Sequence, residues 1–387
     1  MMCSFFLRAA PSVCAVVLGA LALGQAPLEA QRRFQDFDTQ PIVVTPAQRE
    51  AVDRGLAWLA AHQRADGAWP GKVGYKLNND YRYDMALGDG PHVGVTSLAC
   101  MAFLAGGHLP GRGAHSEVIE RGLAFVLSCC NSDGYITHAG TRMYSHAFAT
   151  LFLAEIYGMT HRQDVREHLQ KAVDFIVTTQ NDEGGWRYVP FQPDSDMSIV
   201  VCQVLALRAA RNIGIRVPKS TIDLAAQYVV DSAVTGERTT WNGRLTRDIG
   251  SFHYQRSSGG SRSSFPLTAA GVTALHGVGI YSDELIQRGL EYLQSDLDSF
   301  NARFSRGGHY FFWYGHYYGV QAMYTAGTAF GVEHWKRYFE VVRTELLKLQ
   351  RDDGSWPNDV GPGPAFGTAM AVLVLEIPYR YLPIFQR

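Results

Sequence analysis

One short turn motif recurs along this chain between helices of two kinds, and it constrains the fold more than any other feature. Three copies share the spacing QxxxGxW: QRADGAW at 63–69, QNDEGGW at 180–186 and QRDDGSW at 350–356, with a degenerate copy, CNSDGYI, at 130–136. Self-similarity of this kind is typical of repeat architectures, in which each unit buries its apolar face against its neighbours. The motif glycine suits a left-handed backbone just past a helix end, and the Gln and Trp side chains are suited to tie that end to the next repeat.

The segments before and after these turns differ in their hydrophobic pattern. Those before the turns are amphipathic, as in RGLAWL at 54–59 and RGLEYL at 288–293. Those after the turns are apolar nearly all round, and we expect helices there at 94–106, 144–158, 197–213, 266–278, 314–326 and 366–377. A helix that is apolar on every face is buried on every face, so these helices form an inner layer and the amphipathic helices lie outside it.

Six such helix pairs predict an all-α fold, an (α/α)6 toroid or barrel, as a single domain at residues 45–387 after a linker at 31–44. An open solenoid is the alternative, but the end repeats of a solenoid carry polar capping faces. The last segment, AMAVLVLEIPYRYLPIF at 369–385, is not polar. Closure into a ring is therefore favoured.

The N-terminus has the layout of a secretory signal peptide. Arg8 precedes an apolar run at 9–23, and small residues follow, with cleavage expected after Ala30 or after Gly24. The run is shorter than the ~20 apolar residues of a membrane span. An uncleaved N-terminal anchor is the alternative. We expect residues 1–30 to be the signal peptide, no transmembrane segment after it, and an exported protein, periplasmic or secreted.

Composition excludes several classes of protein. The chain has 387 residues, of which 47% are hydrophobic and 18% charged, with a net charge of −1. It is too apolar to be disordered, and it offers no electrostatic footprint for nucleic acid. The cysteines beyond the signal, Cys100, Cys129, Cys130 and Cys202, fit neither a disulfide scaffold nor a CxxC metal spacing. No DDxxD motif, Gly-rich phosphate loop or nucleophile elbow is present, so no cofactor is expected, and nothing identifies a protein partner.

The QxxxGxW turns between alternating inner and outer helices resemble the repeats of squalene–hopene cyclases and related triterpene cyclases, and protein prenyltransferase β subunits share that toroid. The resemblance covers about residues 45–385 and implies one toroid where those cyclases have two. A sharper match is GGWRYVPFQPDSDMSIVVCQVLAL at 184–207, which is similar to the cyclase segment with the DxDD proton donor. The resemblance implies that Asp196 is the acid that protonates the polyene and that Asp194 is the first aspartate of the motif. Met197 replaces the last aspartate.

The chemistry of alkene protonation explains these residue types. It needs a carboxylic acid held neutral beside a dry apolar cavity, and two nearby carboxylates cannot both ionise cheaply. The carbocation then needs aromatic faces. Candidates for the cavity lining are Tyr144, Phe148, Trp186, Tyr188, Phe312, Trp313, Tyr314, Tyr317 and Tyr318. Two structural alternatives remain: Asp196 as only the N-cap of an inner helix, whose dipole lowers its pKa, and Trp186 as only a turn residue.

Three histidines lie near the starts of inner helices: His92, His146 and His316. In a toroid these starts share one rim with Asp196, so the ionisable groups are expected at the mouth of one apolar cavity, the usual anatomy of a small-molecule site. A structural role for each histidine is the alternative. The set His146, Asp196 and His316 suits Zn²⁺ or Fe²⁺ chemically, but its spacing is unspecific and we predict no metal site.

Three functions remain open on the sequence alone. The first is acid-catalysed chemistry on, or binding of, an apolar isoprenoid-type small molecule in the central cavity. The second is a non-catalytic exported module that binds a lipid or a peptide. The third is a metal-dependent hydrolase or transferase at the toroid mouth. Because function resides in the site rather than in the fold, the fold alone does not decide whether the protein is an enzyme.

Overall fold

The computed structural model describes residues 42–77, 80–83, 85, 88–237, 245, 248–256 and 262–385. Residues 41–387 form one compact unit. The predicted signal peptide and most of the predicted linker lie outside the described residues. Among the described helices, none combines the length and apolarity needed to cross a membrane.

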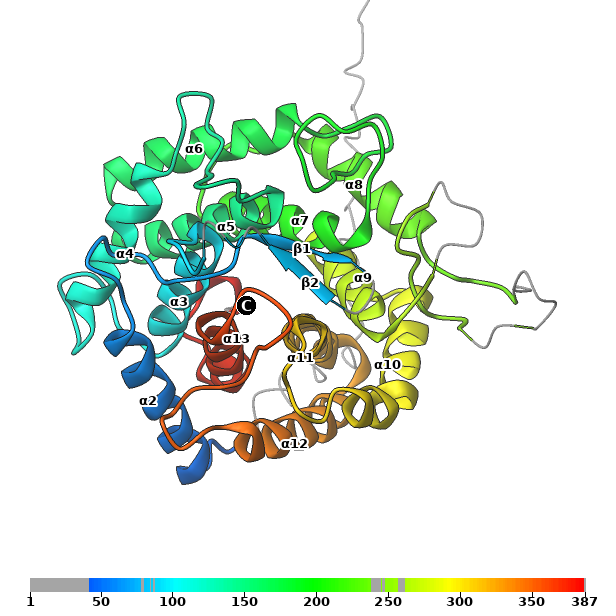
Figure 1. Ribbon diagram of the computed structural model, residues 1–387. Helices are drawn as coiled ribbons and strands as arrows, with labels where there is room; N and C mark the ends of the chain where they lie inside the picture. The colour runs from blue at the N-terminus through cyan, green and yellow to red at the C-terminus, as the bar shows by residue number, and fades with distance from the viewer. Residues whose placement is uncertain are drawn as a thin grey trace, which may run out of the picture. The chain divides into compact units, whose positions relative to one another are not determined.

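The helices of this unit alternate between an outer and an inner layer (Figure 1). The outer helices are α2 (Pro46–Ala61), α4 (Ser116–Ser128), α6 (Gln163–Thr178), α8 (Lys219–Asp231), α10 (Glu284–Arg303) and α12 (Val332–Leu349). The inner helices are α3 (Val93–Ala105), α5 (Met143–Thr160), α7 (Met197–Asn212), α9 (Phe265–Gly277), α11 (Tyr310–Phe330) and α13 (Pro364–Glu376). Every residue of α3 is buried, as expected for a helix that is apolar on every face.

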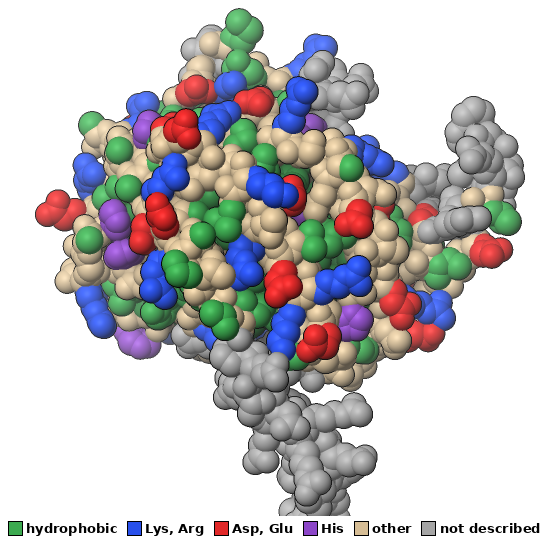
Figure 2. Space-filling model, turned by 90° about the horizontal axis from the view of Figure 1, so that it is seen from below, with side chains coloured by type: hydrophobic (Ala, Val, Ile, Leu, Met, Phe, Trp, Pro, Cys, Tyr) green, Lys and Arg blue, Asp and Glu red, His purple; other side chains and the backbone are tan. Residues whose placement is uncertain are grey.

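The inner helices form a closed ring. Each packs on the next in chain order, and the last, α13, packs on the first, α3. Outer helices α4, α6, α10 and α12 pack on the inner helix that precedes each of them, and α2 packs on α13 in the same way. The predicted all-α toroid of six helix pairs is therefore confirmed, and the open solenoid is excluded. Figure 2 shows cationic and anionic side chains interspersed on one outer face.

The three QxxxGxW turns make the same contacts in each copy. Each tryptophan is buried, and its indole N–H donates to a carbonyl ten residues earlier, in the preceding outer helix: Trp69 to Leu59, Trp186 to Ile176 and Trp356 to Leu346, each at 2.8 Å. Each glutamine donates to the motif glycine and to the first turns of another outer helix: Gln63 to Val118, Gln180 to Thr221 and Gln350 to Ala51. These contacts tie neighbouring outer helices together around the ring.

The motif glycines are required by both conformation and space. Gly67, Gly184 and Gly354 have φ values of 85°, 86° and 91°. A Cβ at Gly184 would lie 2.4 Å from the carbonyl oxygen of Leu224, so the turn passes directly against the next outer helix. A further turn of this kind, unrecognised in the sequence, contains Gly250 with φ 88° and the buried Phe252 in the tryptophan position.

The two ends of the ring are covered by different segments. The antiparallel hairpin β1 (Gly74–Leu77) and β2 (Asp80–Tyr83) lies at the end where the inner helices begin, and the helical pattern did not predict it. There the amide of Lys72 donates to Pro362 at 2.8 Å, and the Tyr81 ring lies 6.1 Å from that of Tyr310. At the other end the chain continues past α13 into the short 3-10 helices η1 (Ile377–Tyr379) and η2 (Pro383–Phe385).

Candidate active site

Asp196 is the N-cap of inner helix α7 and its side chain is fully buried. Its Oδ1 accepts hydrogen bonds from the Ile199 amide, at 3.1 Å, and from the Ser198 hydroxyl. Its Oδ2 accepts no hydrogen bond from the described residues and lies 3.5 Å from Nε of Arg187. The two oxygens therefore differ: one is held by the helix start, and the other carries free acceptor capacity.

Burial sets the protonation of this carboxyl. It raises the pKa of Asp196 to about 6, against the lowering effects of the Ser198 hydroxyl, the Arg187 guanidinium and the α7 amides. The structural cap expected from the sequence is present, but its lowering effect is smaller than the cost of burying the charge. A cap and a titratable acid therefore coexist in one residue.

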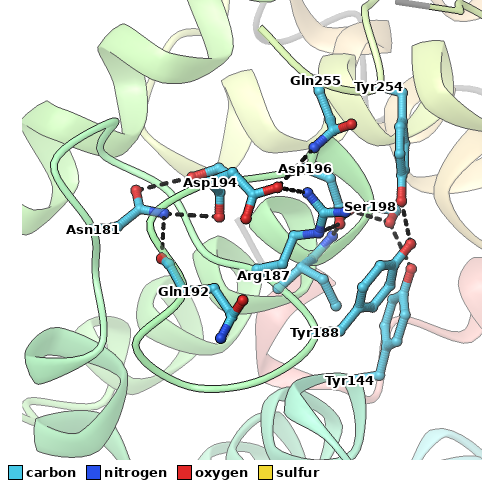
Figure 3. A network of polar contacts seen from close by, with 12 residues as sticks. Tyr144, Asn181, Arg187, Tyr188, Gln192, Asp194, Asp196, Ser198, Tyr254 and Gln255 are labelled. Atoms are coloured by element: carbon cyan, nitrogen blue, oxygen red, sulfur yellow. Dashed lines mark hydrogen bonds and ion pairs between the residues drawn. The ribbon is translucent and has the colours of Figure 1, made fainter. Parts of the chain in front are cut away.

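Arg187 joins the two aspartates of the DSDM stretch (Figure 3). Its guanidinium forms an ion pair with Oδ2 of Asp194 through Nη1 and faces Asp196 through Nε. Asp194 also accepts from Nε2 of Gln255 at 3.1 Å, and its backbone carbonyl accepts from Asn181 at 2.9 Å. The Asp194 side chain is 42% exposed, whereas that of Asp196 is 0% exposed. Asp194 therefore positions Arg187 from the solvent side, and Asp196 faces the interior.

Tyrosine hydroxyls converge on the same place. Tyr144 of α5 donates to the Ser198 hydroxyl at 2.6 Å, and Tyr314 of α11 donates to the Ser198 carbonyl at 3.2 Å. The hydroxyls of Tyr188 and Tyr254 hydrogen-bond to each other. Burial raises the pKa of Tyr144 and of Tyr314 well above the usual value, so both stay neutral phenols. Neutral phenols therefore gather around Ser198, the residue whose hydroxyl donates to Asp196.

Side chains of the inner helices fill the centre of the ring, called here the lumen. Helical spacing places Tyr144, Phe148, Leu151 and Glu155 on the stripe of α5 that faces it, and Tyr310, Tyr314, Tyr317 and Gln321 on that of α11. The Phe148 and Tyr317 rings meet across the lumen with centroids 6.2 Å apart. On α7, Sγ of Cys202 lies 3.0 Å from the Tyr318 hydroxyl. The lumen below Asp196 is therefore aromatic.

Three of the predicted lining residues lie elsewhere. Trp186 packs within its turn, and Trp313 donates its indole N–H to Pro357 at 2.9 Å while fully buried. Phe312 stacks with Phe300 of outer helix α10, with centroids 6.4 Å apart. These rings fill the space between the two layers, so the prediction that they contact a ligand is corrected.

The expected gathering of imidazoles at one mouth is also corrected. Nδ1 of His146 accepts from the Ile136 amide at 3.1 Å, and its ring contacts Phe175 of outer helix α6. His316 bonds to Asn301 of α10 at 2.9 Å and to Tyr338 of α12 at 3.1 Å. Both rings point to the outer layer, about half a helical turn from the lumen stripe. Burial lowers the pKa of each to about 3, so both are neutral.

His92 caps α3, with Nδ1 accepting from the Val95 amide at 3.2 Å, and burial lowers its pKa to about 4. The hypothetical metal set of His146, Asp196 and His316 is wrong, because these side chains face different layers. Among the described residues no group of three or more His, Cys, Asp and Glu side chains could hold a metal ion. The set from which the sequence suggested a metal-dependent hydrolase or transferase is therefore not brought together.

Several residues of the site were not predicted from the sequence. Arg187 follows the motif tryptophan directly, and Ser198 lies two residues after Asp196, so both had a positional signal. Tyr254 and Gln255 lie in a segment with no helical periodicity, and only the fold brings them here. The carbonyl of Tyr254 accepts from the Met197 amide at 2.9 Å, which fixes this segment against the start of α7.

Two surface depressions, of about 470 and 610 Å³, lie along outer helix α2. Arg54 lines both, and its guanidinium donates to the carbonyls of Arg351 and Asp352 at 2.7 and 2.9 Å. They contain none of the residues around Asp196. Trp58, which lines the larger one, likewise donates to Asp353 of the last QxxxGxW turn at 3.2 Å. We assign these depressions no catalytic role.

Comparison with known proteins gives two partial sequence matches. No family model matches the chain. A probable squalene–hopene cyclase of Sinorhizobium fredii is 27% identical over 171 residues, which cover 40% of this chain and 25% of that protein. A drimenyl diphosphate synthase of Streptomyces showdoensis is 23% identical over 186 residues, which cover 47% of this chain and 31% of that protein. The matched region thus spans less than a third of the length of either relative.

Solved structures show the same fold. A type II terpene cyclase from Scytonema superposes with a TM-score of 0.53 at 13% identity, over 87% of this chain and 100% of that one. An α-1,6-mannanase from Salegentibacter superposes with a TM-score of 0.58 at 9% identity, over 85% and 98%. Identities this low show the fold alone. The chain is therefore an α/α toroid with weak homology to squalene–hopene cyclase and terpene cyclase.

Proposed function

We propose that this protein is an acid catalyst of the terpenoid cyclase kind, acting on an apolar isoprenoid-type molecule in the lumen. The observation that carries the proposal is the buried Asp196 carboxyl, whose Oδ2 accepts no hydrogen bond from the described residues while neutral phenols gather around Ser198 beside it. A pKa of about 6 leaves about one tenth of the carboxyls protonated at pH 7, and about half at pH 6. The similarity to cyclases supports the same reaction class.

The proton moves from Oδ2 of Asp196 to one carbon of a substrate double bond, and the π electrons of that bond form the new C–H bond. The other carbon becomes a carbocation, which the faces of the neighbouring tyrosine rings stabilise. The carboxylate that remains is stabilised by Arg187 at 3.5 Å and by the start of α7. The π electrons of a second double bond of the substrate form the ring-closing C–C bond, which moves the positive charge to the far carbon of that bond. That cation loses a proton to water and Asp196 takes a proton back from solvent, so the product is an isomer of the substrate and no redox step occurs.

The second candidate is a non-catalytic toroid that binds an apolar ligand. The contact between Arg187 and Asp196 favours it, because a nearby cation holds a carboxyl in its charged form. The two candidates make different demands on Asp196. Catalysis requires its proton, whereas binding requires only the shape and apolarity of the lumen.

The experiment compares the wild-type protein with Asp196→Asn on squalene and on geranylgeraniol, with products analysed by mass spectrometry. Asn is as good an N-cap as Asp, so α7 and the fold are expected to persist. We expect product from the wild type and a loss of at least ~100-fold in the variant, the scale of a lost general acid. Equal turnover by both proteins would overturn the acid role. Binding of geranylgeraniol by both proteins without turnover would establish the second candidate.

We also propose that the protein is exported and acts outside the cytoplasm. The proposal rests on the signal-peptide layout of residues 1–30. N-terminal sequencing of the protein recovered from the cell exterior tests it. We expect a mature chain that begins at Gln25 or Gln31. An intact N-terminus on protein in the cytoplasmic fraction would contradict export.

A further inference from the structure

The chain beyond α13 crosses one end of the ring. Around the ring, α13 is flanked by α11 and α3, and it lies across from α7. Residues 377–385, named here the C-terminal strap, leave the end of α13 and finish with η2 packed on α5 and α7. Because α5 and α7 are not neighbours of α13, the strap crosses the ring at the end where the inner helices finish.

Contacts along the strap join helices from opposite sides of the lumen. Nε of Arg380 donates to the Tyr324 hydroxyl of α11 at 2.7 Å. Further along, the Ile384 amide donates to Oε2 of Glu155 on α5 at 3.2 Å. Glu155 is the last residue of the α5 stripe, whereas the Tyr324 ring packs against Trp335 of outer helix α12, with centroids 5.3 Å apart. The strap is therefore bonded to α11 on one side of the ring and to α5 on the other.

The strap is buried against the inner helices as well as hydrogen-bonded to them. Leu382 and Ile384 are only 3% and 9% exposed. Pro383 sits on the last turns of α5, where a Cβ at Gly158 would lie 3.8 Å from Cβ of Pro383. At Arg380 the backbone has φ 58°, in the left-handed region. This turn directs the rest of the strap toward the lumen. A non-glycine residue with this φ is uncommon, so the surrounding contacts hold it there.

From this geometry we infer that the C-terminal strap is a removable closure of the lumen, held by Glu155, and that an apolar ligand enters the lumen at this end. The opposite end is tied by the hydrogen bond from Lys72 to Pro362 and by the cap and ion-pair network of Asp196. The strap, by contrast, forms a single turn of 3-10 helix at its end and can leave without breaking the ring. The inference concerns access and does not require the proposed chemistry.

An engineered disulfide between the strap and α5, called here the lock, tests the inference directly. The pair Gly158→Cys and Pro383→Cys has the Cβ separation of about 3.8 Å that disulfides prefer. Two native thiols report the outcome. Cys202 lies on the lumen side of α7 beside Tyr318, whereas Cys100 faces outer helix α4 at Gly122. Both are buried, so alkylation of Cys202 by N-ethylmaleimide reports opening of the lumen and alkylation of Cys100 reports separation of the two layers.

In the wild type we expect Cys202 to be alkylated at least tenfold faster than Cys100, measured by peptide mass spectrometry. The oxidised lock is expected to slow the alkylation of Cys202 at least tenfold and to leave the alkylation rate of Cys100 unchanged. The single Gly158→Cys variant is the control for the contact that a side chain at this position makes with Ile213. Equal rates for Cys202 in locked and wild-type protein, or equal rates for the two thiols in the wild type, would overturn the inference.

A second variant opens the strap instead of locking it. Ile384→Asp places a second carboxyl beside Glu155, which weakens the attachment of the strap. We therefore expect Cys202 to be alkylated faster by tenfold or more. Ile384→Val is the matched control. An unchanged rate in Ile384→Asp would contradict the inference even if the lock failed to form. Exchange of geranylgeraniol gives the last measurement. If neither the wild type nor any variant binds it, the proposed function fails, whereas the thiol rates still decide the role of the strap.

Discussion

Asp196 and Glu155 are buried carboxyls at opposite ends of the inner helices, and their surroundings differ in one respect. The first has the Ser198 hydroxyl, a helix-start amide and the Arg187 guanidinium around it. The second has the Ile384 amide, with Arg208 as the cation that acts on it. Burial raises the pKa of Asp196 to about 6 and that of Glu155 to about 8. With the two side chains almost equally buried, the partners around each carboxyl set its charge.

The difference separates two uses of a buried acid. Asp196 titrates close to neutral pH, so both its protonated form and the carboxylate that remains after proton donation are accessible. Glu155 keeps its proton in that range and serves as a neutral hydrogen-bonding anchor for the strap. The partners around Asp196 include the surface-exposed Asp194, which holds Arg187 in place. The following variants break or sharpen this contrast.

Glu155→Gln is expected to have the largest effect. Folded Glu155 holds its proton up to about pH 8, whereas the ordinary value is 4.5. The folded chain therefore binds more protons between these values, and the free energy of unfolding falls as the pH rises through them. Gln does not ionise, so above pH 8 the variant is expected to be more stable by roughly 5 kcal/mol, with little difference at pH 4. Urea unfolding at pH 4, 6 and 8.5 measures it. A difference that did not depend on pH would contradict the buried anchor.

Arg187→Gln is expected to act on the other carboxyl. Loss of the guanidinium removes a cation that lowers the pKa of Asp196, so that pKa rises further. Since catalysis needs the protonated acid, wild-type kcat/KM is expected to fall about tenfold per pH unit above about pH 6. In the variant this fall is expected about one pH unit higher. A profile with an unmoved midpoint would show that Arg187 does not tune Asp196.

Ser198→Ala is expected to have a smaller effect of the same sign. It removes the hydroxyl that donates to Oδ1 of Asp196 and accepts from Tyr144. The pKa of Asp196 rises, and the free energy of unfolding falls by about 1 kcal/mol, the worth of one hydrogen bond. Thermal unfolding and the pH profile of kcat/KM measure the two effects, and Ser198→Thr, which keeps a hydroxyl, is the control. Identical profiles for Ala and Thr would argue against this contact.

Asp194→Asn is expected to have the smallest effect. Its partner Arg187 is 22% exposed and Asp194 itself is 42% exposed, so solvent screens the ion pair. Stability is expected to change by less than about 1 kcal/mol. The midpoint of the pH profile is expected to shift slightly downward, because Arg187 can then turn fully to Asp196. A loss of activity as large as that of Asp196→Asn would mean that Asp194 itself acts in the reaction.

The sequence predicted the helices well because their signals are local. An apolar run with a motif turn on one side identifies an inner helix, and the predicted range 197–213 differs from the observed Met197–Asn212 by one residue. It also predicted the N-cap position of Asp196 at the start of α7, for the same reason. It failed where long-range contacts decide the outcome, as for Tyr254, which reaches the site from a segment without periodicity.

It also failed to orient His146 and His316, and the reason is physical. Hydrophobicity assigns a helix face only when the faces differ, and α5 and α11 are nearly uniform around their axes. Counting from Tyr144 or Tyr314 places each histidine two residues away, or about 200° around the helix. That geometry was available from the sequence once one lumen residue was known. The hairpin β1–β2 lacked even that signal, because it lies outside the repeat.

The packing of α2 on α13 has a consequence for how this molecule comes apart. An open array of helix pairs loses its outermost unit first, so it frays and its melting is gradual. Here the first and last units pack on each other, and the Gln350 side chain donates a hydrogen bond to the Ala51 carbonyl at 2.8 Å where they meet. No pair is outermost, so none can leave without exposing both neighbours. We therefore expect all helix pairs of the ring to unfold together in one cooperative transition, although the fold is a series of similar repeats.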